Sequence, residues 1–322
     1  MRGRFAAGLG RALNISRVDL VEKDIILHQI LLDLSRNEFF KRNFLLKGGS
    51  CLIKHYLGYY RFSEDVDFTW ADQRVFQGKS GKKIRKLLSE LISEIGKIFE
   101  GIAKSRGLDF RCAKNNRKYV ELVGSGRILT FKIWYNSDIL GRKSFIKVQV
   151  NFVDNLYFNP VEGELHNLLL LKTIDEKEMK FLYPDFYEEY SIPVTLRMYD
   201  IREIICEKIR SILTRRGVKA RDFVDVYMIF KKKRIDPREL DEEIVGKIRL
   251  MLGLYKRFRE NLLATRRLLA SHKLFSWGSE RELLLTEIDE KDFYTFVSTL
   301  SKFLGEIINK IETGEEQGDS SR

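Results

Sequence analysis

The sequence has few of the features that define disulfide-rich, zinc-binding or membrane proteins. Its only cysteines are Cys51, Cys112 and Cys206. Their odd number and wide spacing exclude a disulfide framework and a zinc ribbon. No apolar run is long enough to span a membrane, so no membrane partner is expected. The basic N-terminal stretch has too short an apolar part for a signal peptide, and we therefore expect a cytoplasmic protein.

The composition is that of a folded, basic protein. Of the 322 residues, 44% are hydrophobic, which excludes wholesale disorder, and the length allows one large domain or two ordinary ones. Lysine and arginine number 58 against 46 acidic residues, a formal net charge of +12. This excess suits a polyanionic partner. The four histidines have no partners at metal-ligand spacing.

The periodicity of the apolar residues changes near residue 199. Before this point, helical patterns mix with period-two patterns, which predicts an α+β fold with a mixed or antiparallel sheet. After it, only helical patterns remain. We expect an α/β domain over 1–199 with a flexible arm at 1–17, an all-α domain over 200–312 and a disordered tail over 313–322. Strands are predicted over 43–47, 65–70, 108–113, 118–123, 128–135, 145–153 and 194–199.

Two short segments combine glycine with paired carboxylates. Gly48 and Gly49 follow a predicted strand and open a short helix, while Asp65 and Asp67 lie on the next strand. Residues two apart on a strand point to the same face, so both carboxylates share one face. Paired carboxylates suit Mg²⁺ (or Mn²⁺) bound to nucleotide phosphates. A lone Gly-Gly is commonly a turn and a lone Asp-x-Asp a solvated strand edge, but their combination favours a nucleotide site.

Further residues near the glycines fit phosphate binding. Gly48 and Gly49 allow backbone N–H groups to approach a phosphate closely. Ser50 adds a hydroxyl at the helix start, and Arg61 adds a positive charge. Ser63 is either another phosphate donor, a modification site or a turn residue that caps its own loop.

The segment from Lys47 to Phe68 resembles the nucleotidyltransferase signature of the DNA polymerase β-like superfamily. Its R-F-S-E-D-V-D-F form is similar to that of the AbiEii/AbiGii-type toxin family. A second block, from Glu207 to Asp225, is similar to the family's E-K-x-x-A-L…R…R-D-x-x-D segment, with Ser211 where alanine is usual. The resemblance covers about residues 20–230 and implies a polymerase β-like core.

The resemblance also implies roles for three residues. It makes Asp65, Lys208 and Asp222 necessary for catalysis, with Lys208 on the triphosphate and Asp222 orienting or deprotonating the acceptor hydroxyl. Asp225, one helical turn beyond Asp222, either shares its face or pairs with Arg221 or a nearby lysine.

One departure from the superfamily concerns the third carboxylate of a later strand. In the predicted strand 145–153, alternation directs Val148 and Val150 to the core and leaves Lys147 and Gln149 on the site face. Gln149 stands where an acid is expected. Whether the site holds one metal or two is therefore open.

The resemblance implies a toxin that transfers a nucleoside monophosphate from an NTP to a hydroxyl. The resemblance also implies that this hydroxyl is the 3′ end of a tRNA, and the positive net charge agrees with an RNA acceptor. A cognate antitoxin is the implied partner. The alternatives are an enzyme that nucleotidylates protein and a non-catalytic nucleotide- or RNA-binding module. Thirteen basic residues in 231–273, which include Lys247, form either an RNA-docking face or an ordinary solvated surface.

Overall fold

The computed structural model describes residues 2–171 and 174–319, and the chain divides into two compact units. The first unit comprises Met1–Val153 and Pro160–Met198. The second comprises Asp154–Asn159 and Tyr199–Arg322, so a six-residue segment leaves the first unit and returns to it.

A seven-stranded mixed sheet forms the centre of the first unit, with the strand order β3-β4-β5-β2-β1-β7-β6. The strands are β1 (Phe44–Lys47), β2 (Asp65–Trp70), β3 (Val120–Val123), β4 (Ile128–Asn136), β5 (Lys143–Asn151), β6 (Val161–Leu165) and β7 (Val194–Met198). The central strand β2 is antiparallel to β1 and parallel to β5. The mixed sheet confirms the predicted fold class.

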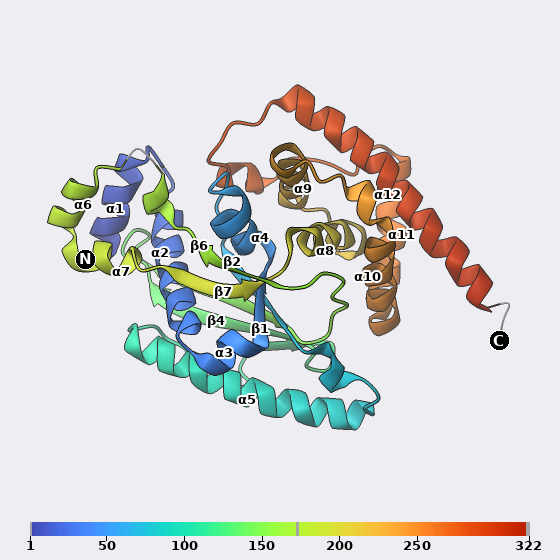
Figure 1. Ribbon diagram of the computed structural model, residues 1–322, viewed down its shortest axis with the longest axis horizontal. Helices are drawn as coiled ribbons and strands as arrows, with labels where there is room; N and C mark the ends of the chain where they lie inside the picture. Colours follow the sequence, from blue (N-terminus) through green and yellow to red (C-terminus); the bar gives the residue numbers. More distant parts are fainter. Residues whose placement is uncertain (1, 172–173, 320–322) are drawn as a thin grey trace. The chain divides into compact units, whose positions relative to one another are not determined.

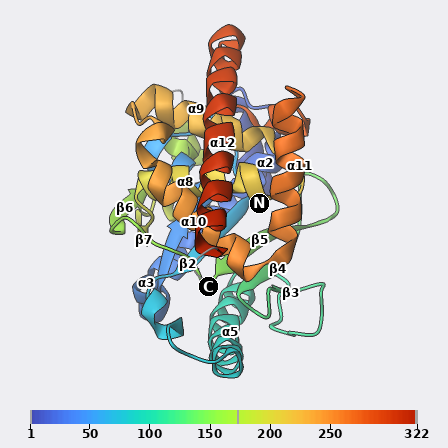
Figure 2. The same cartoon turned by 90° about the vertical axis from the view of Figure 1, so that its right-hand side faces the viewer.

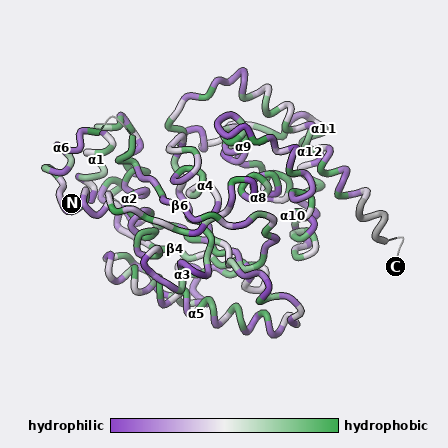
Figure 3. The backbone as a smooth tube through the Cα atoms, viewed as in Figure 1, coloured by the Kyte–Doolittle hydropathy of each residue, from purple (hydrophilic) through white to green (hydrophobic). Residues whose placement is uncertain are grey.

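Helices pack on this sheet through aromatic side chains. In Figure 1, α5 runs along the sheet, and its alternating hydrophilic and hydrophobic residues are visible in Figure 3. Phe99 of α5 lies 5.3 Å from Phe131 of β4, and Phe40 of α3 lies 4.8 Å from Phe68 of β2, both between ring centroids. The helices of this unit are α1 (Arg2–Ala12), α2 (Val18–Ser35), α3 (Glu38–Asn43), α4 (Gly48–Cys51), α5 (Gly81–Ser105), α6 (Glu176–Leu182) and α7 (Pro184–Tyr190).

The N-terminal segment differs from the expected flexible arm at 1–17. Although residue 1 lies outside the described residues, residues 2–12 form α1, whose Phe5 is fully buried. Gly8 permits this packing, because a Cβ at this position would lie 2.8 Å from the ring of Tyr183. Glycines that lower helix propensity therefore also allow close helix packing here.

Two other regions differ from the sequence prediction. Residues 108–113 form no strand and make a single bridge between Asp109 and Trp134. Strand β6 was not predicted, because Val161-Glu-Gly-Glu-Leu has little β propensity. The short helix expected at the two glycines is present; it begins as α4 and continues as a π-helix over Leu52–Leu57.

The second unit is helical. Its central helix α8 contacts α9, α10 and α11, and α10, α11 and α12 lie side by side in Figure 2. The helices are α8 (Ile201–Thr214), α9 (Ala220–Lys233), α10 (Asp241–Leu254), α11 (Lys256–Ala270) and α12 (Glu290–Asp319). Among the residues that the structure describes, no helix is both long and apolar enough to cross a bilayer.

A buried ion cluster fixes the segment Asp154–Asn159 to the helical unit. The Lys247 ammonium of α10 lies 2.9 Å from the Asp154 carboxylate and 2.7 Å from that of Glu203, and Lys247 is fully buried. Glu203 also accepts hydrogen bonds from the backbone N–H groups of Tyr157 and Phe158. This short segment thus supplies the carboxylate and the N–H groups that the buried charges of α8 and α10 require.

The C-terminal tail differs in part from the expected disorder over 313–322. The backbone of residues 313–319 continues α12, and residues 320–322 lie outside the described residues. A polar composition prevents packing into a core, but it does not prevent a long amphipathic helix from propagating.

His28 of α2 makes the stability of the first unit pH-dependent. Burial, with Lys54 close by, lowers the pKa of His28 to about 3. Because the unfolded histidine titrates near its ordinary value, stability is lost as pH falls below that value. Between pH 7 and pH 5 we expect a loss of about 2 kcal/mol, measured by urea unfolding. A His28→Gln variant should lose this dependence, whereas His272→Asn in an exposed turn should retain it.

Candidate active site

The glycine turn begins directly beside the carboxylates of β2. Lys47, the last residue of β1, is the register partner of Asp67. Gly48 follows with φ = +70°, a left-handed conformation that favours glycine. A Cβ on Gly48 would lie 2.7 Å from Asp67 Oδ2. The glycine turn therefore lies directly against the Asp67 carboxylate.

Asp65 and Asp67 lie on the polar face of β2. Between them, Val66 is fully buried, whereas both aspartates are half-buried. On the parallel neighbour β5, Lys147 is the register partner of Asp65 and Gln149 that of Asp67. The Lys147 Nζ lies 3.8 Å from Asp65 Oδ2.

A buried arginine lies against the second glycine. A Cβ on Gly49 would lie 2.7 Å from Arg61 Nη2 and 3.0 Å from Ser63 Oγ. The Ser50 hydroxyl lies 2.6 Å from the Asp65 carbonyl oxygen and 3.1 Å from Ser63 Oγ. Its single proton can serve one acceptor at a time, so in this arrangement Ser50 connects the turn to the start of β2.

Replacing Gly48 tests the close approach. We expect Gly48→Ala to cost about 1–2 kcal/mol in the free energy of unfolding from its left-handed φ alone, and to weaken nucleotide binding by displacing Asp67. Gly107→Ala is a matched control, because Gly107, just after α5, has φ = +64° but open space around its Cβ position. Unfolding and nucleotide titrations of both variants should show similar stability losses but a binding defect only in Gly48→Ala.

The second predicted block forms a buried charge cluster within the helical unit. Lys208 of α8 lies 2.9 Å from Asp222 and 2.6 Å from Asp225, both on α9. Arg215 lies 2.9 Å from the other oxygen of Asp222. The α8–α9 connection contains Gly217 with φ = +73°, a left-handed value that favours glycine. Asp222 and Asp225 therefore share one face and one lysine, and Arg221 is not part of this cluster.

The charges around Asp222 determine its protonation. Burial raises the pKa of the Asp222 carboxyl, but Lys208 and Arg215 outweigh this effect, so that the pKa is lowered overall. An ionised carboxylate with a lowered pKa accepts hydrogen bonds well and is a weak base at neutral pH. The two predicted blocks belong to different units: Gly48, Arg61 and Asp65 to the first, and Lys208 and Asp222 to the second.

The carboxylate pair of β2 fits a divalent cation that also binds a nucleotide. Within residues 2–171 and 174–319, no group of three or more histidine, cysteine, aspartate or glutamate side chains could hold a metal ion. Asp65 and Asp67 would therefore supply two oxygen ligands and leave the others to phosphates and water. This is the usual donor set for Mg²⁺ in nucleotide enzymes.

A second buried lysine lies behind the glycine turn and was missed by the sequence analysis. Lys54, in the π-helix, lies 2.8 Å from Asp24 of α2 and 2.5 Å from the Tyr59 hydroxyl. The Tyr190 hydroxyl of α7 donates to Asp24 at 2.9 Å. The signal in the sequence that could have identified Lys54 is its position four residues after Ser50. The network anchors the turn to α2 and α7, and π-helical segments often occur at functional sites.

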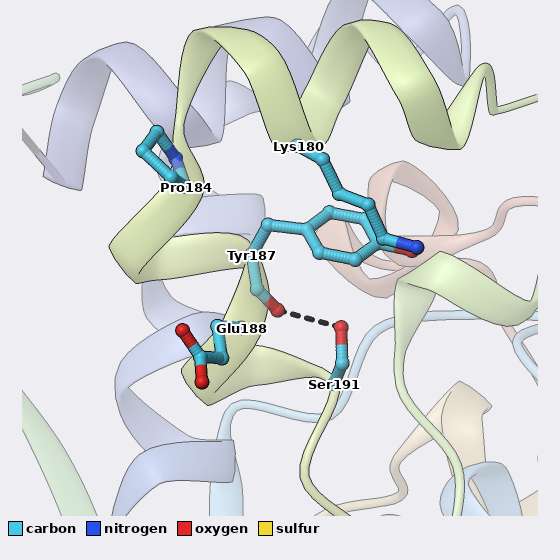
Figure 4. Close-up of a pocket in the computed structure, with 5 residues that line it drawn as sticks. All are labelled: Lys180, Pro184, Tyr187, Glu188 and Ser191. Carbon is cyan, nitrogen blue, oxygen red and sulfur yellow. Dashed lines mark hydrogen bonds between the residues drawn. The ribbon is translucent and has the colours of Figure 1, made fainter.

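A surface pocket of about 440 Å³ occurs elsewhere in the first unit (Figure 4). It is formed by α6 and α7, and the Ser191 hydroxyl donates to the Tyr187 carbonyl at 2.6 Å beside it. Its lining includes none of the predicted site residues. The residues shown in Figure 4 are Lys180, Pro184, Tyr187, Glu188 and Ser191.

The basic residues of the segment 231–273 are exposed, with one exception. Lys247 is fully buried among carboxylates, so its assignment to a solvent-facing basic surface is wrong. One group of exposed cations is on α11, where helical spacing gathers several of them on one face. These residues, called the α11 basic face below, are Lys256, Arg259, Arg266 and Arg267.

Comparison with known proteins gives one family match and several structural matches. The model of the family "Nucleotidyl transferase AbiEii toxin, Type IV TA system" matches residues 29–304. No curated protein matches the chain. JHP933 from Helicobacter pylori is 14% identical, covers 94% of this chain and 97% of its own, and has a TM-score of 0.41. MenT4, a nucleotidyltransferase toxin from Mycobacterium tuberculosis, is 17% identical, covers 92% and 98%, and has a TM-score of 0.40. These scores are low, so the family assignment rests on the family match.

Proposed function

The chain belongs to the AbiEii nucleotidyltransferase toxin family of type IV toxin–antitoxin systems, and from this we propose that it transfers a nucleoside monophosphate from an NTP to the 3′ end of a tRNA. The family consists of NTP-dependent nucleotidyltransferases, which removes the non-catalytic module from the alternatives. In the proposed reaction, the acceptor hydroxyl attacks the α-phosphate, and pyrophosphate leaves.

The observation that carries the proposal is the approach of the Gly48 turn to Asp67. Because Gly48 has no Cβ, the Asp67 carboxylate can lie directly against the turn, so a cation held by Asp67 would lie beside backbone N–H groups that can bind a phosphate. The adjacent Gly49 has the buried Arg61 guanidinium against it, which supplies a fixed positive charge. Preorganised charges of this kind stabilise a transferring phosphoryl group at little reorganisation cost.

Each predicted residue has a role in the proposal. Asp65 and Asp67 hold Mg²⁺, which when bound neutralises charge on the triphosphate. Gly48, Gly49, Ser50, Arg61 and Ser63 contact the phosphates. Lys208 stabilises charge on the triphosphate, and Asp222 orients the acceptor hydroxyl. We assign Asp222 orientation rather than deprotonation because its pKa is lowered.

A tRNA acceptor is supported by charge. The α11 basic face presents four exposed cations on a helix whose only acid is Glu260. Neutralising phosphates gives sequence-independent affinity for RNA. The proposal includes a cognate antitoxin, because the family belongs to toxin–antitoxin systems. A protein acceptor is the second candidate, and for it the α11 basic face has no role.

Label transfer tests the proposal. Purified protein with Mg²⁺ and each α-³²P-NTP in turn is incubated with total tRNA, with and without added protein acceptors. We expect label on tRNA with at least one NTP, and a raised KM for tRNA when Lys256 and Arg259 are both changed to Glu. Label on protein alone would replace the tRNA acceptor with a protein. No label on either, from folded protein, would contradict the transfer reaction.

A further inference from the structure

The side chains next to the carboxylates of β2 differ in charge from those of a two-cation site. Lys147 is the register partner of Asp65 and Gln149 that of Asp67. Lys147 Nζ lies 3.8 Å from Asp65 Oδ2, with side chains 35% and 24% exposed, respectively. The strand therefore places a fixed positive charge and a neutral amide where a further carboxylate would complete a two-cation site.

We propose that Lys147 limits this site to a single divalent cation, an inference that rests on the proposed nucleotide-binding function. Two carboxylates, one ammonium and one divalent cation have the same summed formal charge as three carboxylates and two divalent cations. In the local charge balance, Lys147 thus substitutes for the third carboxylate together with the second divalent cation.

Geometry and composition support the same conclusion. Lys147 comes from the middle of β5, a strand paired on both sides, so its backbone position is fixed. A second divalent cation at Asp65 would lie close to the Lys147 ammonium and would be repelled by it. In the part of the chain that the structure describes, there is also no third acidic or histidine side chain at the carboxylate pair to hold a second cation.

Counting bound Mn²⁺ tests the inference directly. Electron paramagnetic resonance gives the number of Mn²⁺ ions per chain at saturating non-hydrolysable NTP analogue. We expect one ion in the wild type and two in the double variant Lys147→Gln/Gln149→Glu, which removes the ammonium and provides the missing carboxylate at the position of Gln149. Lys147→Gln should retain one ion but bind it about fivefold more tightly, because a nearby positive charge is removed. Lys143→Glu, with the same charge change as the double variant but four residues from Lys147 along β5, should behave as the wild type.

The outcomes separate this inference from the function on which it rests. Two Mn²⁺ ions in a wild-type protein that transfers nucleotide would overturn the inference and leave the function intact. Unchanged Mn²⁺ affinity in folded Lys147→Gln would remove Lys147 from the site. A wild-type chain that binds neither the nucleotide nor Mn²⁺ would overturn both proposals.

Discussion

Asp65→Asn should lower nucleotide transfer by roughly a thousandfold while leaving the protein folded. The variant removes one of the two charged oxygen ligands proposed for the cation, and the loss of several kcal/mol of transition-state stabilisation corresponds to this factor. Stability should change little, because Asp65 is half-exposed and its ion pair with Lys147 is worth less than about 1 kcal/mol. Label transfer and thermal unfolding measure the two effects.

Asp72→Asn is the matched control for this prediction. Asp72 follows the same strand, but its side chain is 41% exposed and its carboxylate pairs with Arg74. Its replacement should leave transfer unchanged. Equal activity of the Asp65→Asn variant and the wild type would place the reactive centre elsewhere in the chain.

Lys247→Met should destabilise the helical unit by about 3–5 kcal/mol. The substitution leaves the buried carboxylates of Asp154 and Glu203 without their cation, and a buried unpaired charge is far costlier than a lost surface pair. Hydrogen exchange should show faster exchange in α8, in α10 and in Asp154–Asn159. Lys302→Met on the exposed face of α12 removes the same charge without this burial and should have almost no effect.

A different outcome for Lys247→Met would be informative. If exchange rose equally throughout both units, the cluster would stabilise the whole chain rather than its helical unit. If the stability of Lys247→Met equalled that of the wild type, protonation would have neutralised the buried carboxylates. Measuring the stability of the variant as a function of pH would show this.

The strand and turn of the candidate site could be predicted because their signals are local. Val66 and Phe68 alternate with Asp65 and Asp67, and this alternation alone fixes which side chains share a face. The same rule correctly directed Val148 and Val150 of β5 into the core and left Lys147 and Gln149 on the other face. The register between the strands then placed them beside the aspartates.

Other features depend on contacts distant in sequence and were not predictable. Glu203 has capping-box spacing from Asp200, yet Asp200 alone caps α8 and Glu203 binds Lys247. Helical spacing from Ile244 and Met251 places Lys247 on the apolar face of α10, but the carboxylates of Asp154 and Glu203 that pair with it are distant in sequence. In α1, Gly8 suggested a broken chain, although its missing side chain is what allows Tyr183 to approach.

The excursion of Asp154–Asn159 into the helical unit has a consequence for synthesis on the ribosome. Asp154 precedes its partner Lys247 by 93 residues. The strands β1 to β5 can therefore pair while this short segment still lacks its binding site, and it must remain exposed until α10 has emerged. Neither unit corresponds to a continuous stretch of nascent chain. A truncated product that ends at Met198 would contain every strand of the sheet but would leave the Asp154 carboxylate without its cation.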